Sequence, residues 1–273
     1  MVFDISVIMT VRNGSNFIKR SVDSILNQTF PPKEVVIVDD GSTDETCMLI
    51  ESIALKSCIP INLIRTSGIG RSKALNLAVK SCSYEWIANL DVDDYWLPGK
   101  LEKQIEIISN LPDAKIVITQ SYLLYEGEKH VFIDSGINNK QLGYKKFDRS
   151  EFYAKNPVNH SSIMFSKGLF DFVGGYNEGL KKQIDYDLWV RFILVPEVFY
   201  QVNAPLTVKY LHGKQSFESR NVISYRLNSF FMKVFALVKL KAPWYFYFKA
   251  MALFFIGFIP SRLKKNLRKF TAS

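Results

Sequence analysis

Cysteine is scarce in this chain. It occurs three times, at Cys47, Cys58 and Cys82, and no two of these residues are spaced as CxxC. An odd number of widely separated cysteines argues against a disulfide framework. We therefore expect all three to be reduced residues in or near the core.

The start of the sequence has no pattern of a secretory leader. Asp4 follows almost at once, and no basic segment precedes a long apolar run. We therefore expect a cytoplasmic protein. With 273 residues, of which 48% are hydrophobic, the chain has enough material for one large α/β domain plus an appendage.

Acidic residues are almost absent from the C-terminal part. From Lys209 onward there are 13 Lys or Arg and one acid, Glu218, whereas residues 1–208 carry 22 Lys or Arg and 25 acids. The net charge of +9 is thus a C-terminal property. Such asymmetry is typical of proteins that bind nucleic acid or an anionic membrane surface.

The segment WYFYFKAMALFFIGFI lies between Pro243 and Pro260. A helix of this length spans about 24 Å, less than the ~30 Å of a bilayer's hydrocarbon core. Its aromatic residues suit an interface, and basic residues without acids follow it: Arg262, Lys264, Lys265, Arg268 and Lys269. We predict that the segment lies on the anionic inner face of the cell membrane, which makes the protein peripheral. The alternative is an apolar helix packed on the main domain; nucleic acid is disfavoured, because aliphatic bulk does not bind phosphates.

Short apolar runs alternate with helical patterns in the first half. Strands are predicted at residues 5–10, 35–39, 61–65 and 86–91, with helices after each, including one at about 71–81 and one from about 98. Ser42 and Glu45 have capping-box spacing at the start of another helix. This βαβ repetition predicts a mainly parallel sheet flanked by helices, with its ligand crevice beyond the carboxyl ends of the strands.

The second half is less regular. Strands are predicted at 116–119, 121–125 and 162–165, a loop at 136–146 and a helix at 186–194. We assign residues 1–216 to the main domain and residues 217–273 to a helical, basic and apolar region that associates with membranes.

An acidic cluster ends one of the apolar runs, in LDVDDYWLPGKLEKQ at residues 90–104. Asp91, Asp93 and Asp94 place oxygen ligands where a buried strand meets solvent, which suits a hard divalent cation that carries phosphates. Asp94 is also placed to cap the following helix. Thr10, Asp39 and Asp40 stand at other strand ends, so we expect them to share one edge of the sheet with Asp91.

Six strings in order resemble glycosyltransferase family 2. They are SVIMTVRNG, VVIVDDGSTDET, GRSKALN, LDVDDYWLPGKLEKQ, HSSIMFSKGLFDFVGGYNE and IDYDLWVRF, and they cover about residues 4–216. The resemblance implies a GT-A fold, a nucleotide-sugar donor, a divalent metal (Mn or Mg) and inversion at the anomeric carbon. The chain has neither GxxxxGK[ST] nor GxGxxG, and TVRNGSNF lacks the Gly-rich loop that a rival sugar nucleotidyltransferase needs.

The resemblance implies a donor site. Thr10, Arg12, Asp39 and Asp40 match positions that hold the nucleoside, with Asp40 the better match for the base; both aspartates are also placed to cap the next helix. By similarity Asp91 touches the ribose or shares the metal. Arg71 and Lys73 match basic positions that face the diphosphate, and the alternative for them is a solvated helix start.

Metal ligation is assigned to Asp93 first, then to Asp91 and to His212. His212 in YLHGKQS resembles the lid segment that closes over the diphosphate, where a neutral imidazole can complete the metal shell. Its alternative is an exposed loop histidine.

The acceptor side needs a general base. Asp185 matches the catalytic member of an acidic pair, whereas Ile184 stands where the family usually has Glu. Asp187 is the fallback, but on a helix it points away from Asp185 and is placed to pair with Arg191. His160 and Trp189 are candidate acceptor contacts, with a structural hydrogen bonder and a core residue as their respective alternatives.

Together with these residues, the resemblance implies an inverting, metal-dependent transferase that moves a sugar, most often from a UDP-sugar in this family, to a glycan acceptor. The predicted acceptor is lipid-linked and belongs to surface polysaccharide synthesis, because the tail places the enzyme at a membrane. The alternative, motivated by Ile184, is a catalytically silent member that binds a nucleotide sugar or a partner protein.

Overall fold

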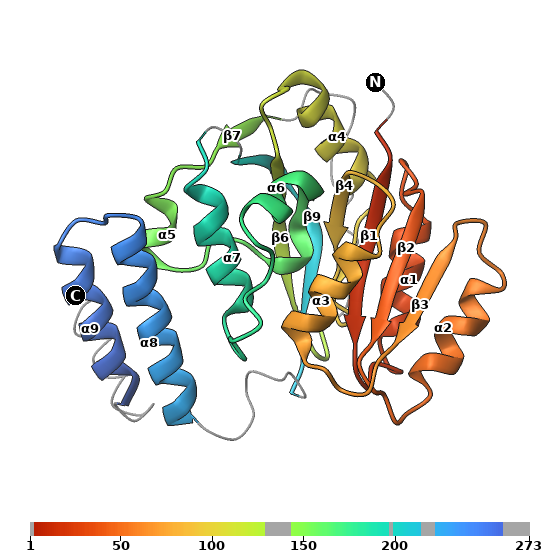
Figure 1. Cartoon of the computed structure of the whole chain (residues 1–273), viewed down its shortest axis with the longest axis horizontal. Coiled ribbons are helices and arrows are strands. Elements are labelled where there is room, and N and C mark those ends of the chain that lie inside the picture. The colour runs from red at the N-terminus through yellow and green to blue at the C-terminus, as the bar shows by residue number, and fades with distance from the viewer. Residues whose placement is uncertain (1–2, 129–142, 197–198, 214–221, 259–273) are drawn as a thin grey trace.

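A single mixed sheet forms the centre of the molecule (Figure 1). The computed structural model describes residues 3–128, 143–196, 199–213 and 222–258. Within these residues the strand order is β3-β2-β1-β4-β8-β6-β9-β5, and β7 pairs with β9. The strands are β1 (Ile5–Val11), β2 (Glu34–Asp39), β3 (Ile61–Arg65), β4 (Trp86–Asn89), β5 (Tyr95–Trp96), β6 (Ile116–Tyr125), β7 (Tyr144–Lys146), β8 (Ile163–Ser166) and β9 (Phe199–Leu211).

Helices cover both faces of the sheet, and the two C-terminal helices lie at one side of the domain. The helices are α1 (Ile18–Leu26), α2 (Thr46–Ala54), α3 (Arg71–Lys80), α4 (Lys100–Asn110), α5 (Glu151–Ala154), α6 (Lys167–Phe172), α7 (Ile184–Ile193), α8 (Val222–Lys239) and α9 (Tyr245–Phe258), with a short 3-10 helix η1 (His160–Ser162).

The first four strands are parallel, as the βαβ pattern predicts. β1 lies between β2 and β4, with Val7 opposite Val35 on one side and Ala88 on the other, and β3 extends the sheet beyond β2. The carboxyl ends of β1, β2 and β4 therefore meet at one edge.

The second half of the sheet is not mainly parallel. β8 runs antiparallel to β4 and β6, and β5 and β7 run antiparallel to β9, whereas β6 and β9 are parallel. β6 is one strand where the sequence predicted two, because its register to β9 shifts at Gln120 without ending the pairing. The long strand β9 was not predicted; Asn203 and Pro205 interrupt its apolar pattern.

Alternate residues of each strand feed two separate cores. On β1, Ile8 belongs to a cluster with α3 and α7, and Val7 and Met9 belong to a cluster with α1 and α4. Because side chains of a strand alternate between faces, a sheet covered on both sides needs apolar residues at nearly every position. The run from Ile5 to Met9, which is fully buried, meets that need.

The predicted capping box is wrong. α2 begins at Thr46, and Glu45 at its N-cap position makes no side-chain cap. Ser42 instead accepts a hydrogen bond of 2.8 Å from the backbone of Asn13, across the loop that follows β1. Asp44 accepts from the Thr46 backbone at 3.1 Å. Ser42 thus joins the loops after β1 and β2 instead of capping α2.

The C-terminal helices α8 and α9 form an antiparallel pair at the side of the domain (Figure 1). Met232, Ala236 and Leu240 join the same core cluster as α7, so α8 packs into the main domain. α9 packs on α8 and α5, with Phe254 against Phe230. No helix within the described ranges is long and apolar enough to cross a bilayer. The predicted basic stretch from Arg262 to Lys269 lies outside the described residues.

Candidate active site

The predicted donor residues follow the ends of neighbouring parallel strands. Thr10 and Arg12 lie at the end of β1, Asp39 ends β2, and Asp91 follows β4. Asp39 Oδ1 accepts from the backbone of Gly41 at 3.1 Å and of Ser42 at 2.8 Å, which shapes the turn after β2. The structure therefore brings these residues to one edge, as the sequence predicts.

Asp40 connects the end of β2 to the loop before α3 through hydrogen bonds. Its carboxylate accepts from Thr66 Oγ1 at 2.6 Å and from the backbone of Ile69 and Gly70 at 2.7 and 2.9 Å. Burial acts to raise the pKa of Asp40, but these bonds and the nearby charge of Arg12 outweigh it, so the pKa lies below its usual value. Neither Asp39 nor Asp40 caps α2. Their roles in binding a nucleoside stay predictions.

Arg71, the first residue of α3, stands among the carboxylates of the site. Its Nη2 donates to Asp91 Oδ1 at 2.8 Å. Its pKa is raised above the usual arginine value, first by Asp91 and then, against the effect of burial, by Asp185 and Asp93. Residues far apart in sequence therefore converge on one cation. Lys73, two residues further on, is exposed on the same helix.

His160 lies at the centre of a buried polar network. Its Nδ1 is 2.8 Å from both Asp91 Oδ1 and Asn89 Nδ2, and its Nε2 is 2.8 Å from the Tyr176 hydroxyl. Burial acts to raise the pKa of Asp91, but Arg71 and His160 hold it far below its usual range. Only 5% of His160 is exposed, so its role here is structural: it forms a hydrogen bond that positions Asp91. An acceptor contact by His160 stays a prediction.

Trp189 packs behind this network. Its side chain is fully buried, lies 5.8 Å from the His160 ring and stacks on Phe192. A fully buried ring has no face for a sugar, so the structure supports the core alternative for Trp189 rather than an acceptor contact.

Asp93 and His212 bring one carboxylate and one imidazole together. His212 Nε2 lies 3.3 Å from Asp93 Oδ2, although the two residues are 119 positions apart in the sequence. The imidazole is not an exposed loop side chain: it is 9% exposed, and its ring centroid lies 4.6 Å from that of Phe17 and 5.7 Å from that of Tyr210. Among the described residues no three acids, histidines or cysteines form a metal-binding group. The pair nevertheless offers the oxygen and nitrogen donors that Mn²⁺ accepts.

Asp94 is neither a helix cap nor exposed. α4 begins at Lys100 with Gly99 before it, whereas Asp94 accepts from Ser161 Oγ and, at 3.0 Å, from the Tyr210 backbone. Burial and the neighbouring charges of Asp93 and Asp91 raise the pKa of Asp94 to about 8. Asp94 therefore ties η1 to β9 underneath the site.

Asp185 and Asp187 separate as the helical geometry predicts. Asp185, in the first turn of α7, accepts from Asn156 Nδ2 at 2.9 Å on the side of the site. Asp187 is buried and pairs with Arg191, whose Nη2 lies 2.6 Å from Asp187 Oδ2. Ile184 is 6% exposed and belongs to the core, so its side chain occupies no part of the carboxylate cluster.

Sequence reasoning missed two polar residues of the site. Arg20 on α1 donates to the backbone carbonyl of Asp93 at 2.7 Å, and its guanidinium lies 4.5 Å from the Tyr210 ring and 4.8 Å from the Tyr95 ring. Asn156 orients Asp185. Arg20 was missed because it lies in an ordinary amphipathic helix pattern. Asn156 was missed because the loop that holds it has no periodic pattern.

Comparison with known proteins agrees with this architecture. The family model for Glycosyl transferase family 2 matches residues 6–173. The chain is 32% identical over 242 residues to the O-antigen biosynthesis glycosyltransferase WbnJ of Escherichia coli, covering 84% of this chain and 89% of that protein. It is 31% identical over 199 residues to an uncharacterized glycosyltransferase of Rickettsia typhi, covering 72% of this chain and 60% of that protein's length.

Solved structures show the same fold. Staphylococcus aureus TarS residues 1–349, crystallised with UDP-GlcNAc, superposes with a TM-score of 0.68 at 19% identity, over 93% of this chain and 72% of that one. The mixed sheet with helices on both faces thus has the GT-A fold, as predicted. The chain belongs to glycosyl transferase family 2.

Proposed function

We propose that this protein is an inverting, metal-dependent glycosyltransferase that moves a sugar from a UDP-sugar to a hydroxyl of a lipid-linked glycan. The observation that carries the proposal is the contact of Arg71 with Asp91, 2.8 Å, at the strand ends, where Asp185 and Asp93 also raise the pKa of Arg71. A cation and several carboxylates at one edge suit a ligand that brings both a diphosphate and a metal ion.

The relatives support the type of product. WbnJ is named for O-antigen biosynthesis, and the Escherichia coli chondroitin synthase, 29% identical over 214 residues, also makes a polysaccharide by its name. This chain covers only 29% of the length of that synthase. The TarS structure contains UDP-GlcNAc, which supports a UDP-sugar donor here. Surface polysaccharide synthesis is therefore the proposed setting.

The donor is proposed to lie across the strand ends. Thr10, Arg12, Asp39 and Asp40 hold the nucleoside, and the half-exposed Arg71 faces the diphosphate together with Lys73. Asp91 already bonds Arg71 and His160, so it orients the guanidinium as well as touching the ribose or the metal.

The donor set near Asp93 fits a divalent metal. Asp93 and His212 would hold Mn²⁺ or Mg²⁺, and the oxygens of a diphosphate suit the remaining positions of such an ion. When bound, the ion supplies positive charge that stabilises the leaving diphosphate.

Asp185 is the proposed general base. Asn156 donates to Oδ2, which leaves Oδ1 to take the proton of the acceptor hydroxyl. The acceptor oxygen then forms its bond to the anomeric carbon as the bond from that carbon to the diphosphate breaks. One in-line displacement of this kind inverts the configuration. Arg71 stays charged throughout and stabilises the negative charge of the departing diphosphate.

The decisive experiment is a screen of nucleotide sugars for release of nucleoside diphosphate, with and without Mn²⁺ and with lipid-linked glycan acceptors. Asp185→Asn is expected to lower transfer at least 100-fold while keeping nucleotide binding. Asp171→Asn, at an exposed position on α6, is the matched control. Wild-type binding of a nucleotide sugar without any transfer would instead support the catalytically silent alternative.

A further inference from the structure

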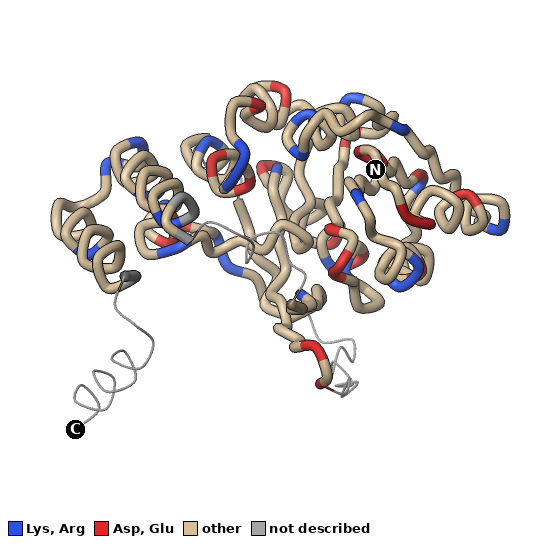
Figure 2. Tube along the Cα trace, turned by 90° about the horizontal axis from the view of Figure 1, so that it is seen from below, with Lys and Arg blue, Asp and Glu red and all other residues tan. Residues whose placement is uncertain are grey.

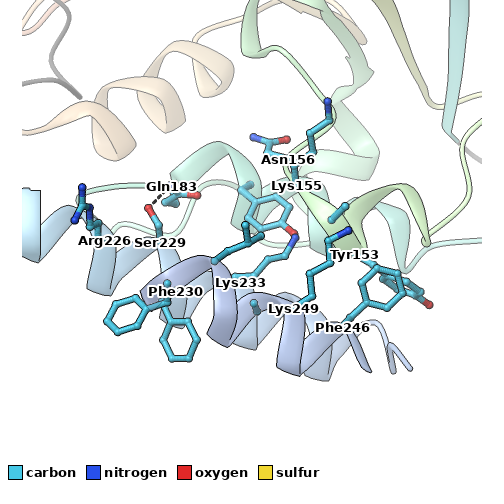
Figure 3. Close-up of a pocket in the computed structure, with 15 residues that line it drawn as sticks. Tyr153, Lys155, Asn156, Gln183, Arg226, Ser229, Phe230, Lys233, Phe246 and Lys249 are labelled. Atoms are coloured by element: carbon cyan, nitrogen blue, oxygen red, sulfur yellow. Dashed lines mark hydrogen bonds between the residues drawn. The ribbon is translucent and has the colours of Figure 1, made fainter. Parts of the chain in front are cut away.

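A pocket of about 260 Å³ lies between the C-terminal helices and the main domain (Figure 3). We call it the α8–α9 pocket; α5 and the residues after it, the start of α7, and both C-terminal helices line it. We propose that this pocket binds the phosphate group of the lipid-linked acceptor and so places the acceptor sugar beside Asp185. This inference rests on the proposed function and names the acceptor subsite of the same reaction.

The first argument is charge. Lys155, Arg226, Lys233 and Lys249 line the pocket, and none of its described lining residues is Asp or Glu. Figure 3 shows Lys233 of α8 and Lys249 of α9 extending from their helices toward the segment that holds Lys155. Several cations gathered from three elements suit a dianionic phosphate, which Lys binds as a point charge.

The second argument is the cost of this arrangement. Lys233 donates to the Phe152 carbonyl at 3.2 Å, and burial together with the charge of Lys249 lowers its pKa to about 8. A partly buried lysine beside another lysine lowers the stability of the folded chain. A bound anion reverses this repulsion, and perturbed groups of this kind cluster at functional sites.

The third argument selects a phosphate on an apolar chain over a free phosphate. Phe230, Phe246 and Phe254 also line the pocket. The outer surface of α9 continues this apolar character, because Phe248, Leu253 and Phe255 are each more than half exposed. Contiguous exposed apolar residues rimmed by cations are typical of surfaces that lie against lipid.

The fourth argument is the connection to the proposed base. Asn156 and Gln183 are both lining residues. Asn156 donates to Asp185, and Gln183, two residues before Asp185, donates to Ser229 of α8 at 3.0 Å. Gln183 has a positive φ of 57°, an unfavourable conformation that persists where the surroundings impose it. The pocket therefore begins one side chain away from the carboxylate that takes the acceptor proton.

The α8–α9 pocket and the reaction centre carry opposite charges, which suits them to different ligands. At the reaction centre Asp91 pairs with Arg71, and Asp185 and Asp93 raise the pKa of Arg71, whereas Lys and Arg are the charged residues that line the α8–α9 pocket. Figure 2 shows Lys and Arg on both C-terminal helices. A phosphate entering from the membrane is thus attracted to the pocket rather than to the carboxylates.

The test uses the full chain and farnesyl diphosphate as a probe, with excess UDP present to fill the donor site. Lys233→Gln/Lys249→Gln is expected to weaken binding of the probe at least tenfold, and Lys239→Gln, at an exposed position near the end of α8, to leave it unchanged. Farnesol has the apolar chain without the phosphates, and inorganic pyrophosphate has the phosphates without the chain. Both are expected to bind much more weakly than the probe. Lys155→Gln provides a second variant outside the helix pair should the double variant not fold.

Two results overturn the inference. One is unchanged affinity for farnesyl diphosphate in the variants. The other is that the variants bind farnesyl diphosphate normally and lose only binding to vesicles that contain phosphatidylglycerol. That result would assign these cations to the membrane surface instead. In a transfer assay the double variant is expected to raise KM for a lipid-linked acceptor at least tenfold with kcat nearly unchanged. Probe binding without sugar transfer by the wild type would refute the proposed function and leave the pocket intact.

Discussion

The guanidinium of Arg71 and the carboxylate of Asp91 lie 2.8 Å apart, and this contact joins the first residue of α3 to the loop after β4. It places the positive charge of Arg71 among carboxylates that the sequence keeps far apart. Asp185 and Asp93 also raise the pKa of Arg71, so its positive charge is stabilised by more than one carboxylate.

Arg71→Lys is expected to lower kcat/KM for the donor by about 10 to 100-fold, because an ammonium does not reproduce the forked donor geometry of arginine. Steady-state release of nucleoside diphosphate checks this. Lys80→Met, at the exposed last residue of the same helix, is the control. Equal loss in both variants would mean that α3, and not the guanidinium, had been damaged.

Asp187→Asn is expected to lower the free energy of unfolding by about 3 kcal/mol, because it leaves the partly buried Arg191 without its carboxylate partner. Urea denaturation measures the effect. Transfer by the fraction that stays folded is expected to match that of the wild type, in contrast to Asp185→Asn. A stable but inactive Asp187→Asn would move the general base to Asp187.

Removal of the divalent metal by a chelator is expected to abolish transfer, and added Mn²⁺ to restore it. Asp93→Asn and His212→Ala are each expected to raise the Mn²⁺ concentration for half-maximal rate at least tenfold, because each removes one proposed ligand. Transfer that persists in the chelator would refute the metal requirement while leaving the assignment of Asp185 untouched.

Lys233 is expected to make stability depend on pH on the alkaline side. Its pKa is about 8 in the folded chain against an ordinary value of 10.5, so between these values the folded chain binds fewer protons and stability rises with pH. The rise is on the order of 1 kcal/mol, given partial exposure. Lys233→Met is expected to remove this part of the rise in urea titrations across that range. Lys239→Met is the control, and an identical pH profile for both variants would contradict the assignment.

Much of the first half of the molecule could be predicted from the sequence. The helix over residues 71–81 and the strand at 61–65 match α3 and β3 almost residue for residue. Local propensity and burial on both faces dictate these elements, because each parallel strand is apolar along most of its length. The gathering of Asp39, Asp40 and Asp91 at one edge followed from the same pattern.

Other features depend on contacts that no local pattern records. The strand β9 forms because β6, β5 and β7 supply partners for it. The difference between Asp93 and Asp94, which are adjacent in sequence, arises from burial: Asp94 lies underneath the site against Ser161, and Asp93 lies beside His212.

The sequence by itself determined the family, the parallel strands of the first half and the residue types available for diphosphate chemistry, because these follow from local pattern and spacing. Only the tertiary structure decided which carboxylates meet at Arg71, that Trp189 is core, and that cations from α8 and α9 face Asn156 across a pocket. Charge interactions act through space over a few ångströms. Residues more than a hundred positions apart in the chain come that close only when the sheet and its helices are packed.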